Sequence, residues 1–117
     1  IHYSEGGWPG ANPKDMEFFR KIKKVRLKNS MVTAFGSTRH AKTTASRDPV
    51  LKGLLSAGTK IITISGKSWD LHVRDVFKIP LEENLKMISD SVKYLRSKDR
   101  RVFYDTEHFF DGYIHNP

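Results

Sequence analysis

The same local pattern recurs four times along the chain, and this repeat limits the fold more than any other feature. Each copy consists of a short β-rich run, a loop containing Gly, Ser or Thr, and an amphipathic helical stretch. The β-rich runs cover residues 1–5, 31–36, 60–65 and 101–107. Alternation of strands and helices is typical of parallel sheets, because parallel neighbours need a crossover and crossovers are almost always right-handed. The sequence therefore predicts an α/β fold built from parallel βα repeats.

Helix start signals support this alternation. Asn12-Pro13 and Asp48-Pro49 each place a residue that caps a helix N-terminus before a proline, which suits the first helical turn. Pro80 opens a third helical stretch, in which leucine, isoleucine and valine recur at helical spacing. The run KIITIS at 60–65 is apolar enough to be buried on both faces, which is typical of a strand inside a parallel sheet.

The length of the chain restricts which parallel fold it can complete. With 117 residues it has room for one domain but is too short for a whole (β/α)₈ barrel. Ile1 falls inside the first predicted strand, and Asn116-Pro117 repeats the helix-opening signal at the last two positions. We therefore expect a single domain over residues 1–117 that is a piece of a longer βα array, truncated at both ends. Its two unpaired strand edges favour assembly into a homo-oligomer.

The charge balance is strongly positive, with 21 Lys and Arg residues against 13 Asp and Glu residues and a net charge of +8. An anionic partner therefore has to be considered. The basic residues gather near the ends of the predicted helices and lack the interleaved aromatic residues that stack on bases, so nucleic acid is not an expected partner. No apolar run approaches the ~20 residues of a membrane span, and there is no cysteine for disulfides. These features predict a cytoplasmic protein without a membrane partner.

Two carboxylates stand at the end of the fourth predicted strand. Asp105 and Glu107 are two positions apart, so on a strand both side chains point to the same face. In parallel βα folds the functional residues gather at the carboxyl ends of the strands, and two carboxylates there could position a substrate hydroxyl, hold a metal-bound water or act as a base. The alternative is a structural ion pair with an Arg or Lys from a neighbouring strand. The residues alone leave both interpretations open.

Other motifs of the chain carry weaker signals. Gly66-Lys67-Ser68 lacks the glycine that a phosphate-binding loop needs five residues earlier, because that position is Ile61. His72 and His108 could each be a metal ligand, but no local spacing supplies three ligands. The loop Ser37–Lys42 contains basic residues that could bind an anion, although a solvated loop explains them equally well.

Longer strings in a fixed order point to a known family. The chain resembles the citramalate synthase branch of the 2-isopropylmalate synthase family in the segments EGGWPGANPKDMEFF, VTAFGSTR, DPVLKGLLSAGTKIITISGKSWDLHV, LEENLKMISDSVKYL and YDTEHFFDGY. The resemblance covers essentially the whole chain. It implies a partial, half TIM barrel made of about strands two to five of a catalytic barrel that condenses acetyl-CoA with a 2-oxo acid. The product would be citramalate from pyruvate, or 2-isopropylmalate from 2-oxoisovalerate, in branched-chain amino-acid biosynthesis (isoleucine or leucine).

The resemblance also implies roles for particular residues. Glu107 matches the catalytic glutamate of the family's fifth strand, Asp105 falls at the neighbouring substrate-pocket position, and Glu5 matches the acidic residue that ends the family's second strand. Asp105 and Glu5 are therefore expected to bind substrate, and so is Arg39, from its place in the basic loop Ser37–Lys42. A divalent metal, Mg²⁺, Mn²⁺ or Zn²⁺, is implied for the whole enzyme, with ligands outside this chain, so the isolated chain is expected to be inactive. The alternative hypothesis is an autonomous basic βα module that binds an anionic ligand and performs no chemistry.

Overall fold

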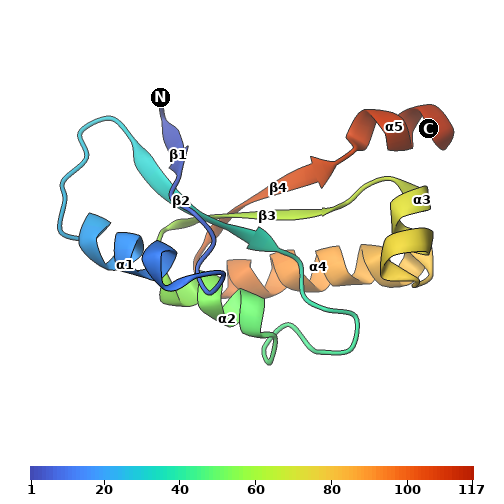
Figure 1. The fold of residues 1–117 in the computed structure, drawn as a ribbon, viewed down its shortest axis with the longest axis horizontal. Helices are drawn as coiled ribbons and strands as arrows, with labels where there is room; N and C mark the ends of the chain where they lie inside the picture. Colours follow the sequence, from blue (N-terminus) through green and yellow to red (C-terminus); the bar gives the residue numbers. More distant parts are fainter.

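Four parallel strands form one sheet in the computed structural model, which describes all residues from 1 to 117. The strands are β1 (Tyr3–Glu5), β2 (Met31–Ser37), β3 (Ile61–Lys67) and β4 (Arg101–Glu107). They follow one another across the sheet in chain order, and every neighbouring pair is parallel (Figure 1). The predicted α/β class with parallel βα repeats is therefore confirmed.

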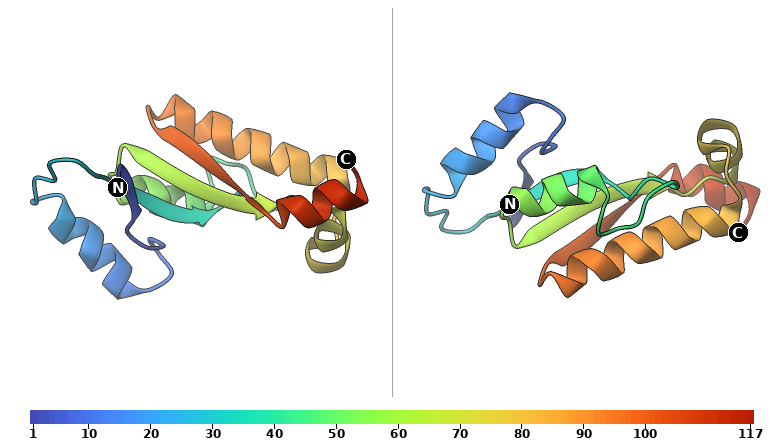
Figure 2. Two further views of the ribbon diagram at one scale, coloured as in Figure 1. Left: turned by 90° about the horizontal axis from the view of Figure 1, so that it is seen from above. Right: turned by 90° about the horizontal axis from the view of Figure 1, so that it is seen from below.

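The strands are joined by helices that lie on one side of the sheet (Figure 1). The crossovers are α1 (Pro13–Ile22), α2 (Pro49–Ser56) and α4 (Leu81–Ser97). Because each new strand is added at the same edge and each crossover has the same hand, the crossovers all fall on one face. Two further elements lie near the carboxyl ends of the strands (Figure 2): α3 (Asp70–His72), which continues into a π-helical turn over Val73–Phe77, and α5 (Phe109–His115).

The helix starts follow the cap signals of the sequence. The Asn12 side chain accepts a hydrogen bond from the Asp15 N–H at 3.0 Å, at the start of α1. The fully buried Asp48 accepts from the N–H groups of Val50 and Leu51 at 2.9 and 3.1 Å. These bonds satisfy donors that the first turn of a helix otherwise leaves unpaired.

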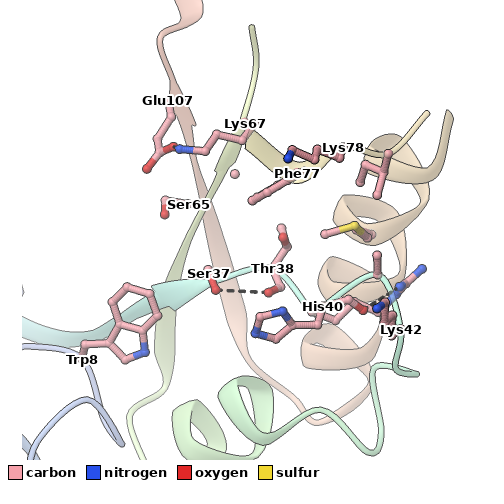
Figure 3. A pocket seen from close by; sticks show the side chains of 15 residues that line it. Trp8, Ser37, Thr38, His40, Lys42, Ser65, Lys67, Phe77, Lys78 and Glu107 are labelled. Atoms are coloured by element: carbon pink, nitrogen blue, oxygen red, sulfur yellow. Dashed lines mark hydrogen bonds and ion pairs between the residues drawn. The ribbon is translucent and has the colours of Figure 1, made fainter. Parts of the chain in front are cut away.

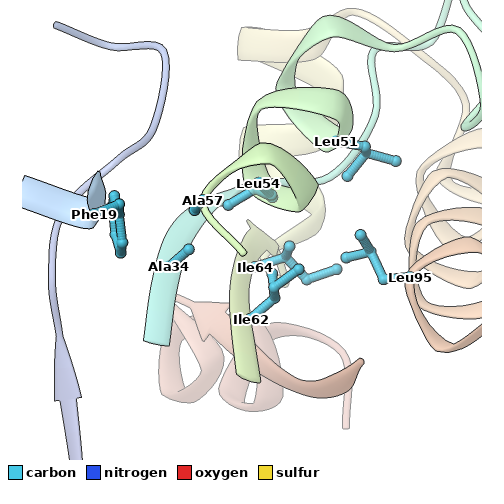
Figure 4. Close-up of a cluster of buried hydrophobic side chains, with 8 residues drawn as sticks. All are labelled: Phe19, Ala34, Leu51, Leu54, Ala57, Ile62, Ile64 and Leu95. Carbon is cyan, nitrogen blue, oxygen red and sulfur yellow. The ribbon is translucent and has the colours of Figure 1, made fainter. Parts of the chain in front are cut away.

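The core is a single layer between the sheet and its helices (Figure 4). Side chains alternate along each strand, so Ala34, Ile62 and Ile64 point toward the helices while Thr33 and Thr63 point to the other face. The buried cluster consists of Phe19, Ala34, Leu51, Leu54, Ala57, Ile62, Ile64 and Leu95. This layer fixes α2 and α4 against the sheet and so fixes the ends of the strands.

The face without crossover helices curls inward. Tyr3 on β1 and Phe103 on β4, the two outer strands, make an edge-to-face contact with ring centroids 5.0 Å apart. Arg101 on β4 also donates a hydrogen bond to the Tyr3 hydroxyl at 2.9 Å. Side chains from opposite edges of a flat four-stranded sheet would not meet, so the sheet has the curvature of a half-barrel. None of the helices is long and apolar enough to cross a membrane.

Candidate functional site

A pocket of about 710 Å³ lies at the carboxyl ends of β2, β3 and β4 (Figure 3). Parallel strands end at the same edge of a sheet, which brings together residues far apart in the sequence. Ser37, Ser65 and Glu107 come from three successive strands, and Trp8 reaches in from the loop after β1. The rest of the wall is formed by the loop after β2, the π-helical turn and the start of the connection to α4. Five of the fifteen lining residues are hydrophobic, and four of the five charged ones are basic.

Glu107 is paired with a lysine from the neighbouring strand. Lys67 and Glu107 are register partners on β3 and β4, and the Lys67 ammonium makes an ion pair with Glu107 Oε2 (Figure 3). The two side chains are 21% and 37% exposed, so the pair is half-buried and open to the pocket. The ion pair that the sequence analysis kept as an alternative is thus present for Glu107. It does not remove the carboxylate from the pocket.

Arg39 also lines the pocket, but its guanidinium is buried and fully used by the protein. Nε and Nη2 donate to Asp90 Oδ2 at 3.1 and 2.9 Å, and Nη2 also donates to Glu83 Oε1 at 3.2 Å. Nη1 donates to the carbonyl oxygens of His40 and Thr43. These bonds occupy all five N–H donors that an arginine has. The geometry therefore gives no support to direct substrate binding by Arg39, which stays a prediction.

Asp105 and Glu5 lie at the same end of the sheet but outside the wall of this pocket. Asp105 is in register with Ser65 on β3, two positions before the Lys67–Glu107 pair, and its side chain is exposed. Glu5 is the last residue of β1 and is exposed without an ion-pair partner. The structure thus brings Glu107 and Arg39 to one pocket and leaves the other two predicted substrate residues beside it, so their roles stay predictions.

A cluster of histidines next to the pocket was not foreseen from the sequence. Trp69 has the rings of His72, His108 and His115 around it, with centroid distances of 4.7, 6.0 and 6.2 Å. The rings of His72 and His108 are 4.5 Å apart, and His108 Nδ1 lies 3.1 Å from Asp111 Oδ2. Nevertheless, no three His, Asp or Glu side chains of the chain are arranged to hold a metal ion. The residues present therefore do not fit a metal centre by themselves.

A second cavity, of about 480 Å³, lies on the helix side of β4 between α4 and α5 and is lined mainly by apolar side chains. Tyr104 points into it from β4, and its hydroxyl is buried without a hydrogen-bond partner. Burial raises the pKa of this phenol, and the carboxylates of Glu107 and Asp105 add to the rise. Burial has this effect because it disfavours the charged phenolate.

Sequential parallel strands, crossover helices on one face and a pocket at the strand ends define the chain as a curled half-barrel of the (β/α)₈ type. Over its whole length the chain is similar to (R)-citramalate synthases. It is 56% identical over 117 residues to the proteins of Geobacter sulfurreducens and Aquifex aeolicus, and 53% identical over 117 residues to that of Synechocystis sp.. The family resemblance predicted from the motifs is therefore confirmed.

The matched segment is only part of each relative. The chain spans 22% of the Geobacter and Aquifex proteins and 21% of the Synechocystis protein, while each match covers 100% of the chain. No family model matches the chain. The similarity therefore relates this chain to about a fifth of a citramalate synthase.

Proposed function

We propose that this chain supplies part of the catalytic barrel of a cytoplasmic (R)-citramalate synthase, an acyltransferase. In that reaction the methyl carbon of acetyl-CoA bonds to the carbonyl carbon of pyruvate, and water then cleaves the thioester to release citramalate and free CoA thiol. The observation that carries the proposal is the similarity to (R)-citramalate synthases, at 48–56% identity, over the whole chain or all but one residue of it. Because all of these relatives are named citramalate synthases, pyruvate is favoured over the bulkier 2-oxoisovalerate as the 2-oxo acid.

Within this reaction we assign proton transfer to Glu107. The condensation needs a proton to leave the acetyl methyl group, and a carboxylate at the edge of a pocket is suited to accept it. Asp105 and Glu5 are exposed at the same end of the sheet, which fits contacts with substrate in a complete barrel. We propose that Arg39 contributes to substrate binding indirectly, by holding the loop after β2 in place, because its donors are already engaged by protein groups.

The family resemblance also implies a divalent metal, Mg²⁺, Mn²⁺ or Zn²⁺, in the complete enzyme. Since this chain has no suitable group of ligands, we propose that the ligands belong to other segments of the barrel. Acetyl-CoA remains the proposed co-substrate. The residues of this chain then contribute the pocket wall and Glu107, and the 117-residue chain alone is expected to be inactive.

A binding module without chemistry is the second candidate, and the charge of the pocket favours it. The lining includes Arg39, Lys42, Lys67 and Lys78 but only one carboxylate, that of Glu107. Lys42 and Lys78 have no ion-pair partner in the structure, so their charge is available to an anion. The substrates of the proposed condensation are themselves anions, so binding alone does not separate the two candidates.

A chimera separates them. In it, this chain replaces the matching segment of the Geobacter sulfurreducens relative, and circular dichroism verifies folding. We expect the folded chimera to release CoA thiol from acetyl-CoA only when pyruvate is added, and the 117-residue chain to release none. A folded chimera that binds CoA without releasing thiol would favour the binding module. Thiol release by the 117-residue chain above the buffer rate would contradict its expected inactivity.

We further propose that the 117-residue chain self-associates. β1 and β4 each have only one neighbour in the sheet, and the inward-curling face has no layer of crossover helices. Two four-stranded half-barrels related by a twofold axis along the barrel would pair β4 of each copy with β1 of the other. We expect sedimentation to show a mass that rises with protein and salt concentration, since the net charge of +8 opposes association at low salt. A strict monomer with slow amide exchange in both outer strands would contradict this proposal.

A further inference from the structure

We propose that Lys67 is a positioning residue for Glu107: it holds one carboxylate oxygen so that the other faces the pocket. This inference deepens the proposed function and rests on it. Glu107 accepts the Lys67 ion pair through Oε2, whereas its Oε1 accepts no hydrogen bond within the chain. A base needs one free oxygen held at a defined place, and this arrangement provides one.

Lys67 is itself fixed from three directions. Its carbonyl oxygen accepts a hydrogen bond from the side-chain amide of the buried Asn84 on α4, at 2.9 Å. The ammonium lies 5.9 Å from the centroid of the Phe77 ring in the π-helical turn. The next residue, Ser68, donates its N–H to the Glu107 carbonyl at 3.2 Å, so β3 and β4 stay paired up to the ion pair. Two of these contacts fix the backbone at Lys67 and the third lies beside its ammonium, so the side chain starts from a fixed point on the pocket wall.

The Lys67–Glu107 pair also differs from an ordinary surface pair of this molecule. Lys21 and Glu17 on α1 form an ion pair at 2.7 Å in which the side chains are 76% and 56% exposed. Such exposed pairs contribute little to stability and do not hold either side chain in place. The Lys67–Glu107 pair is more enclosed, joins two in-register strands and stands on a pocket wall. Stability alone therefore does not account for its position.

The inference can be tested in the Geobacter chimera with three lysine variants. Lys67→Met removes the ammonium but keeps a flexible chain, Lys67→Arg restores a cation, and Lys60→Met makes the same change at an exposed lysine just before β3. We expect Lys67→Met to lower kcat by about 10-fold or more with the KM values for pyruvate and acetyl-CoA changed by less than about 3-fold. Lys67→Arg should recover most of kcat, and Lys60→Met should match the parent. A folded Lys67→Met chimera with kcat within about 2-fold of the parent would overturn the proposal.

A second measurement does not depend on activity. A double-mutant cycle with Lys67→Met and Glu107→Gln in the 117-residue chain measures whether the two side chains are coupled in unfolding by urea. We expect the combined effect on the unfolding equilibrium constant to differ from the product of the single effects by about 3-fold or more, which exceeds the deviation of independent sites. Coupling in unfolding without a loss of kcat in Lys67→Met would show that the pair is merely structural and would overturn the proposal. The absence of coupling would also overturn it, because the two side chains would then not interact. A folded but inactive chimera would refute the proposed function and the positioning role together, while the cycle would still record the contact.

Discussion

Two ionic sites border the same pocket, and they differ in whether any polar atom is left free. Around Arg39, the guanidinium is 4% exposed, and every N–H donor is bonded to Asp90, Glu83 or a backbone carbonyl. Around Glu107, Lys67 engages one carboxylate oxygen and leaves the other without a partner. The first site is closed, and the second is open to the pocket.

The difference shows that a residue can lie at a strand end without having an atom free to contact a substrate. Arg39 follows β2 and Glu107 ends β4, so both meet the expectation that functional residues gather at the carboxyl ends of parallel strands. However, a group can contact a substrate only through an atom that the fold has not already used. We therefore expect changes at Arg39 to act mainly on stability and changes at Glu107 mainly on turnover.

The largest expected effect is the loss of the closed site. Arg39→Met removes five side-chain hydrogen bonds, three of them to carboxylates of α4, while the backbone N–H of residue 39 still donates to Ser91 Oγ on α4. We expect a loss of about 3 kcal/mol in the free energy of unfolding, because several hydrogen bonds to a buried cation are lost while the carboxylates left behind, 30% and 37% exposed, can be solvated. Urea denaturation of the 117-residue chain measures it, with Arg47→Met at an exposed arginine of the same loop as the control. Equal stability of the two variants would mean that Arg39 has no structural role.

At the open site we expect a substitution of Glu107 to lower turnover and to leave stability nearly unchanged. Glu107→Gln keeps the shape of the side chain and an oxygen for Lys67 but removes the base. We expect kcat of the chimera to fall about 100-fold, equivalent to about 2.7 kcal/mol in the activation barrier, with little change in the unfolding midpoint. Glu82→Gln, at an exposed glutamate of α4, is the matched control. Turnover within a few-fold of the parent would make Glu107 a structural carboxylate.

Much of the fold was accessible from the sequence because its signals are local. The Asn12 and Asp48 caps, the leucine spacing of α4 and the apolar run of β3 all act within a few residues. The helix α5 was not predicted. Its N-cap, His108, has a left-handed backbone with φ of 55° and makes no capping bond, and most of the helix is exposed. The helix α5 therefore has neither a capping residue nor a buried stripe from which a helix could be predicted.

The site was accessible only in part, because its contacts are distant in the sequence. The strand pattern placed Glu107 at a strand end, and the alternative interpretation, an ion pair with an Arg or Lys from a neighbouring strand, is present as the Lys67–Glu107 pair. Which lysine it would be depends on the register of β3 with β4, which only the packed sheet fixes. The partners of Arg39 lie 44 and 51 positions away on α4. No local spacing reveals such a pairing.

A smaller effect is expected from a substitution at Gly112 on α5, which packs directly against the backbone of Ser68 beside the open site. A Cβ atom on Gly112 of α5 would lie 2.2 Å from the Ser68 carbonyl oxygen, which is too close for any real contact. Gly112→Ala would gain about 1 kcal/mol of helix propensity but lose about 1–3 kcal/mol through overpacking. We expect net destabilisation, with faster amide exchange in α5. Ile114→Ala, at an exposed position of the same helix, is the control, and a stabilised Gly112→Ala variant would contradict the close packing.

The smallest expected effect concerns Tyr104, a buried polar group that belongs to neither ionic site. Burial raises the pKa of its phenol above 10.0, its ordinary value. Between the unfolded and folded pKa values the unfolded chain has lost a proton that the folded chain keeps, so stability falls as the pH rises through this range. Below pH 10 the contribution of this group to stability is fully present.

Tyr104→Phe tests this directly. At pH 7 the variant should be as stable as the parent or more stable by up to about 1 kcal/mol, because the hydroxyl it removes has no hydrogen-bond partner. Above pH 10 the parent should lose stability more steeply than the variant. Urea denaturation at several pH values measures both, with Tyr113→Phe at an exposed tyrosine as the control. Parallel stability curves for Tyr104→Phe and the parent up to the alkaline limit would show that the Tyr104 phenol ionises as freely in the folded chain as in the unfolded one.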